Sequence, residues 1–70
     1  MEEEIGAAAG AIWHALHSKG GLTLSRLQKE VHAKKPVFDW AIGWLAREDK
    51  ICFTSSKRSL VIELKNGHAK

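Results

Sequence analysis

The 70-residue sequence is poor in the residues that cross-link or interrupt a chain, with one cysteine, one proline and one methionine. A single cysteine cannot form a disulfide within the chain, so we expect a protein of the reducing cytoplasm. No apolar run approaches the roughly 18 residues that a membrane-spanning helix needs. The opening residues, MEEEIGAAAG, are acidic, whereas a secretory signal begins with a basic segment. These absences argue against disulfide-rich, membrane-spanning and secreted proteins.

Hydrophobic and charged residues are present in ordinary amounts. They make up 44% and 27% of the chain, which is typical of a globular protein and argues against disorder. The formal net charge is +3, and three of the eight acids are gathered at Glu2, Glu3 and Glu4. The rest of the chain is therefore more basic than the net value indicates. That excess suits an anionic partner and equally suits ordinary solubilising lysines.

The first part of the chain predicts an amphipathic helix from Glu3 to Ser18. The leading glutamates suit the positive end of its macrodipole, and Gly20 and Gly21 are expected to end it. Its apolar residues recur at steps of three and four, which places them on one stripe. These residues are Ile5, Ala8, Ala9, Ile12, Trp13 and Leu16.

Two further helices are predicted on either side of a short turn. Thr23 can cap the second helix, and His32 to Lys35 make the turn. Pro36 fits the first position of the third helix, where its missing N–H costs nothing, and this helix runs to about Glu48. The residues that share one face of the second helix are Leu24, Leu27, Gln28 and Val31.

The last third of the chain alternates between apolar and other residues, which is typical of strands. We predict a hairpin in which Phe53 pairs with Leu60 and Ile51 with Ile62, putting four large residues on one face. A brief strand at 21–23 could join the same sheet. Residues 66–70 are polar and expected to fray, so that residues 1–65 form a single domain. The predicted register leaves the loop to Ser55, Ser56, Lys57 and Arg58.

The order of these elements is that of a winged helix-turn-helix, an α+β fold of three helices followed by a C-terminal β-hairpin wing. Thr23-Leu24-Ser25 at the start of the second helix and WLAREDKI at the end of the third match its usual pattern. AIGWLAREDKI in so short a chain is similar to a family of small stand-alone bacterial winged-helix proteins classed as a domain of unknown function. The resemblance implies a lone domain, with self-association as an option, and no part in a larger regulator.

The third helix has more apolar residues than one face can hold. Phe38, Ala41, Ile42 and Leu45 have the spacing of a core stripe. Val37, Trp40 and Trp44 form a second stripe, roughly 60–100° around the axis, where a helix-turn-helix contacts its groove. A reader of base edges would have Arg, Lys, Asn or Gln there.

Three interpretations of Trp40 and Trp44 stay open. They complete the core, or they form a protein interface, or they stack on nucleic-acid bases. In a homodimer, the same patch would meet itself across a two-fold axis, and Gly43 would let two helices approach closely.

Basic residues near the predicted turn and wing favour a nucleic acid. Cations at such positions contact phosphates, although charged hairpin tips also keep edge strands soluble. The leading prediction is a module that binds double-stranded DNA with weak sequence preference, as a homodimer. The alternative is a protein-interaction or homodimerisation module that uses the apolar third helix and binds no DNA. The candidate phosphate-binding residues are Lys34, Lys35, Lys57, Arg58 and Arg26.

The sequence predicts no catalytic, cofactor or metal site. His14 and His17 have a spacing that can place two imidazoles on one metal, but no third ligand lies nearby in the sequence. Cys52 lies on a predicted strand without a recognisable base. No glycine-rich phosphate loop follows a strand, and 70 residues leave little room for a substrate pocket. We therefore expect neither an enzyme nor a small-molecule substrate.

Overall fold

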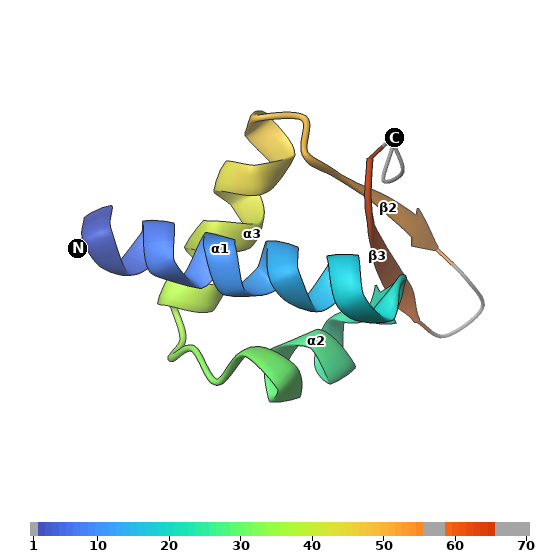
Figure 1. Cartoon of the computed structure of the whole chain (residues 1–70), viewed down its shortest axis with the longest axis horizontal. Helices are drawn as coiled ribbons and strands as arrows, with labels where there is room; N and C mark the ends of the chain where they lie inside the picture. Colours follow the sequence, from blue (N-terminus) through green and yellow to red (C-terminus); the bar gives the residue numbers. More distant parts are fainter. Residues whose placement is uncertain (1, 56–58, 66–70) are drawn as a thin grey trace.

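The computed structural model describes residues 2–55 and 59–65 of the chain. Its described part contains three helices and one antiparallel sheet, and the helices precede the hairpin as the winged helix-turn-helix prediction requires (Figure 1). The elements are α1 (Glu2–Lys19), β1 (Leu22–Thr23), α2 (Leu24–Val31), α3 (Val37–Arg47), β2 (Ile51–Ser55) and β3 (Leu60–Leu64).

α1 extends one residue beyond the prediction at each end. Three glutamates occupy its first turn, where the helix dipole favours negative charge. It ends at Gly20, whose φ of +82° is a left-handed conformation that glycine adopts without a steric penalty. The Gly20 N–H donates to the Leu16 carbonyl at 2.8 Å, which satisfies one of the last carbonyls of the helix.

α2 is short and is capped at both ends. As predicted, Thr23 is its N-cap, and the Thr23 Oγ1 accepts a hydrogen bond from the Arg26 N–H at 3.2 Å. The helix ends at His32 in a left-handed conformation, with its N–H directed to the Gln28 carbonyl at 3.3 Å. Leu27 is fully buried, whereas Leu24, predicted to share its face, is 37% exposed.

α3 begins one residue later than predicted, with Pro36 as its N-cap, and ends at Arg47. The carbonyls of Lys34 and Pro36 accept the N–H groups of Phe38 and Trp40, each at 2.9 Å. The predicted core stripe is confirmed, because three of its members are buried and the fourth packs partly buried against them. Those members are Phe38, Ala41, Leu45 and, partly buried, Ile42.

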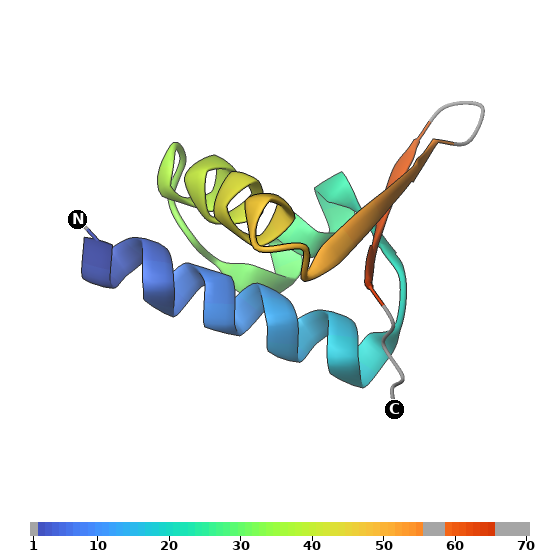
Figure 2. The ribbon, with the colours of Figure 1, turned by 90° about the horizontal axis from the view of Figure 1, so that it is seen from above.

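The core lies where α1 crosses α2 and α3 and meets the inner face of the sheet. Figure 2 shows α1 running along one side of the molecule, and in both Figures 1 and 2 the hairpin lies toward the C-terminal end of α1. The largest fully buried side chains come from every layer, which is how a domain this small closes around one core. They are Phe38, Ile12, Leu27 and Ile62.

The predicted register of the hairpin is wrong by two residues. Phe53 pairs with Ile62, not Leu60, and Ile51 pairs with Leu64, so Ser55 belongs to β2 instead of the loop. A shift of two keeps every side chain on its face, and alternation alone therefore cannot tell the two registers apart. Lys57 and Arg58 of the expected loop lie outside the described residues.

β3 is the central strand, because the short strand predicted near 21–23 pairs with it on the side away from β2. The inner face of the sheet is only partly covered. Ile51 and Ile62 are buried, whereas Phe53 is 43% exposed, since the hairpin extends away from the helices (Figure 2).

Candidate functional site

The two tryptophans of α3 lie on the surface. Trp40 is 44% exposed and Trp44 is 47% exposed, so the interpretation in which they complete the core is wrong. The reason is helical geometry: Phe38, Ala41 and Leu45 already turn one stripe toward the core, and the tryptophans lie well around the axis from it. Val37, expected on the same surface stripe, is partly buried and packs against the core.

We define the outer face of α3 as its exposed stripe of five residues: Asp39, Trp40, Gly43, Trp44 and Arg47. The acid lies in the first turn and the base in the last. Within the described residues, neither Asp39 nor Arg47 forms an ion pair. The surface of this face thus consists mainly of the two indole rings. The charge of Asp39 lies near its N-terminal end and that of Arg47 near its C-terminal end.

A hollow of about 320 Å³ borders this face between α1 and α3. Trp44 and Trp13 line it together with Gly6 and Gly10, and a methyl group at either glycine would meet nothing within 4 Å. The Trp13 ring stacks on the His17 ring, with 4.8 Å between centroids and 12° between planes. Sequence reasoning missed this hollow, although two glycines four apart inside an amphipathic helix were a signal for it.

Of the predicted phosphate-binding residues, the structure describes Lys34, Lys35 and Arg26. Lys34 and Lys35 are exposed at the α2–α3 turn, but the Arg26 Nε lies 3.5 Å from a Glu30 carboxylate oxygen. Lys57 and Arg58 fall outside the described residues.

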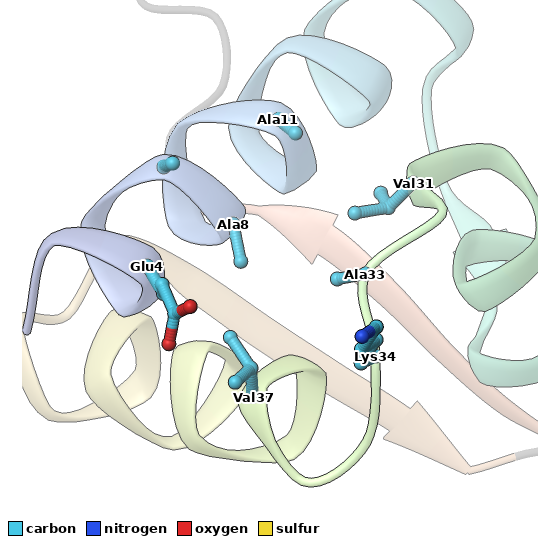
Figure 3. Close-up of a pocket in the computed structure, with 8 residues that line it drawn as sticks. Glu4, Ala8, Ala11, Val31, Ala33, Lys34 and Val37 are labelled. Carbon is cyan, nitrogen blue, oxygen red and sulfur yellow. The ribbon is translucent and has the colours of Figure 1, made fainter. Parts of the chain in front are cut away.

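Lys34 also faces an acidic part of the molecule. It lines a second hollow, of about 330 Å³, between α1 and the α2–α3 turn. Figure 3 shows Lys34 and Glu4 on opposite sides of this hollow, whose remaining walls are alanine and valine. The acidic start of α1 therefore lies across this hollow from Lys34.

The remaining candidates for metal binding or catalysis are the histidines and Cys52. Across residues 2–55 and 59–65 there is no group of three His, Cys, Asp or Glu side chains that could hold a metal ion. His14 and His17 both contact Trp13, and Cys52 is a half-buried free thiol. In the same ranges no helix combines the length and the apolar character needed to cross a membrane.

Lys65, directly after β3, has a raised pKa. Its Nζ donates to the Asp49 Oδ1 at 2.6 Å, and this hydrogen bond, with the Asp49 charge, raises the pKa of Lys65 above its ordinary value of 10.5. The pair ties the end of β3 to the α3–β2 turn. Neither residue lines either hollow, although Lys50, the neighbour of Asp49, lines the hollow beside Trp44.

Comparison with known proteins gives a family, a similar protein and a similar solved structure. A family model described as a winged helix-turn-helix domain (DUF2582) matches residues 1–64. The uncharacterized protein MJ1608 of Methanocaldococcus jannaschii is 40% identical over 68 residues, which is 93% of this chain and 96% of that protein. The solution NMR structure of protein BT2368 from Bacteroides thetaiotaomicron is 33% identical with a TM-score of 0.80, covering 97% of this chain and 83% of that one.

Proposed function

This chain belongs to the winged helix-turn-helix family DUF2582, and from that premise we propose that it is a non-catalytic cytoplasmic module that binds protein through the outer face of α3. One observation carries the proposal. The helix that enters the major groove in a DNA-binding winged helix here exposes two tryptophans, Trp40 and Trp44, on successive turns.

The chemistry of this face suits a protein better than a base pair. Clustered exposed indoles mark association surfaces, and tryptophan is enriched among the residues that contribute most to binding. Base edges are bound by Arg, Lys, Asn or Gln, and of these the outer face has only Arg47, at the C-terminal end of the helix. Groove-reading helices contact bases with their N-terminal residues, where this helix carries the negative charge of Asp39.

Nucleic-acid binding is a second candidate, supported by Lys34 and Lys35. Both are exposed at the turn before α3, and neither forms an ion pair with the described residues. With Arg26, and with Lys57 and Arg58 of the wing, they would contact phosphates and give double-stranded DNA binding of weak sequence preference. This contact would leave the outer face of α3 free for protein.

Alanine variants test whether the tryptophans serve the surface or the fold. Trp40→Ala and Trp44→Ala should each lower the free energy of unfolding by only about 1–2 kcal/mol, since roughly half of each side chain is already in water. The buried control Leu27→Ala should cost about 2–5 kcal/mol. Urea unfolding at low protein concentration measures the fold without association. A tryptophan variant as destabilised as Leu27→Ala would overturn the proposal.

A duplex titration tests how α3 responds to DNA. Amide NMR spectra are recorded with a short mixed-sequence duplex at low and at physiological salt. We expect the amide chemical shifts of residues Asp39 to Arg47 to stay unchanged at both salt concentrations. Shifts at Lys34 and Lys35 that fade as salt rises, and that disappear in Lys34→Ala/Lys35→Ala, would support the second candidate beside the first. Shifts along the outer face of α3 at physiological salt would instead contradict our proposal.

A further inference from the structure

We infer that the partner of the outer face of α3 is a second copy of this chain, with the two α3 helices crossing in opposite directions at Gly43. This inference rests on the proposed function and deepens it by naming the partner. In the pair, Asp39 of each copy lies beside Arg47 of the other. Three features of the described surface lead to this arrangement.

The first feature is Gly43 itself. It lies inside a helix, where glycine is less stable than alanine, and a methyl group added there would meet nothing within 4 Å. Nothing within the described chain therefore requires a residue without a side chain at this position. A close approach by another helix does require it, because a missing Cβ lets two backbones come nearer than ordinary side chains allow.

The second feature is the charge on either side of Gly43. Asp39 and Arg47 are each four residues from it, so they lie about 6 Å from it along the axis, in opposite directions and on the same row of the helix surface. When two such helices run in opposite directions about Gly43, each acid meets a base. When they run in the same direction, acid meets acid and base meets base. The charges thus favour one orientation and oppose the other.

The third feature is the position of the tryptophans. Trp40 and Trp44 lie on the same side of the row formed by Asp39, Gly43 and Arg47. On this side Trp44 lines the hollow beside α1. A two-fold axis that crosses α3 at right angles keeps this side of both helices on one side of the pair. All four tryptophans then meet between the two α1 helices, where Gly6 and Gly10 leave space for them. The surface is self-complementary, as an isologous interface requires.

This arrangement also explains why the outer face of α3 lacks the side chains with which a DNA-binding winged helix contacts base edges. An α3 that is paired with another α3 cannot enter a major groove. Lys34 and Lys35, which belong to the turn and not to the outer face, remain available for phosphate contacts in the pair.

Charge reversal tests the pairing. Sedimentation equilibrium of the full chain should give twice the 7.8 kDa monomer mass for the wild type at low salt. In the pair, positions 39 and 47 meet at two symmetric contacts, so Asp39→Arg or Arg47→Asp alone places like charges together at both. Each single variant should weaken dimerisation by about tenfold or more. The double variant Asp39→Arg/Arg47→Asp restores two opposite-charge contacts and should restore the dimer. Lys29→Asp, an exposed reversal on α2, should change nothing.

Each possible result is informative. A monomeric wild type, single reversals that leave the dimer unchanged, or a double variant that stays monomeric would overturn the inference. An amide NMR spectrum of each variant verifies that it is folded. Failure here is distinct from failure of the proposed function, because the stability of the tryptophan variants and the response of α3 to DNA are measured without reference to self-association.

Discussion

At the scale of single residues, Gly21, before β1, and Gly43, inside α3, differ in what surrounds them. Gly21 has no room for a side chain, because a methyl group there would lie 2.9 Å from the Glu63 Cγ. Gly43 has open space instead, and so its presence destabilises α3 without any benefit that the described chain explains. The absence of a side chain at Gly21 is explained by contacts within the monomer. At Gly43 it is explained by the second copy that covers the outer face of α3.

Gly43→Ala should therefore act in opposite directions on folding and on association. We expect the free energy of unfolding of the monomer to rise by about 0.5–1 kcal/mol, because alanine is the better helix former. Dimerisation should weaken, because the new methyl group separates the two helices. Urea unfolding at low concentration and sedimentation of the same sample measure the two effects. The control Gly21→Ala should lower stability, and a Gly43→Ala protein that dimerises more tightly would contradict the close-approach role.

At the scale of elements, the α3–β2 turn is joined by two hydrogen bonds to Lys65, directly after β3. Asp49 has a left-handed conformation with φ of 63°, and the Lys50 N–H donates to the Leu45 carbonyl at 3.0 Å. The Lys65 N–H then donates to the Lys50 carbonyl at 2.9 Å, beside the side-chain pair of Lys65 with Asp49. The turn between helix and wing is thereby held by both backbone and side chains.

The side-chain pair should make a small, pH-dependent contribution to stability. Asp49 raises the pKa of Lys65 in the folded protein, so the contribution is complete below the ordinary value of 10.5 and is lost as the pH rises through the raised pKa. Asp49→Asn removes the charge with a residue that tolerates the left-handed conformation. We expect a slightly lower Tm at neutral pH, by an amount limited by solvent exposure of the pair.

Thermal unfolding of wild type and Asp49→Asn across pH gives the measurement. The Tm difference between them should shrink once the pH exceeds 10.5. A difference that stays constant over the whole range would show that the ion pair is not its source.

At the scale of the whole molecule, local signals in the sequence predicted most of the fold. Thr23 and Gly20 marked helix ends correctly, because capping and a left-handed glycine are chemistry of the chain around them. The register of the hairpin could not be predicted, because registers two residues apart put the same side chains on the same face. Phe53 was predicted to share a face with other large residues, but its 43% exposure depends on how far the helices reach along the hairpin.

The candidate site was only partly predictable for the same reason. The second stripe of α3 was visible in the sequence, but whether Trp40 and Trp44 were core or surface depended on how α1 crosses α3. The hollow beside Trp44, and the hollow that Glu4 and Lys34 both line, join residues that are far apart in the chain. Such pairings come from packing, and no local pattern records them.

β1 is only two residues long. It pairs with the central strand β3, although α2, α3 and β2 lie between these two strands in the sequence. Leu22 lies opposite Ile62, and Thr23 opposite Val61. Closing so long a loop carries a large entropic cost, which contacts formed earlier within the loop must offset. We therefore expect α2, α3 and the hairpin to assemble from neighbours in the sequence first. The two residue pairs between β1 and β3 then form late in folding. Their formation indicates that the helices and the hairpin strands between them in the sequence have already folded.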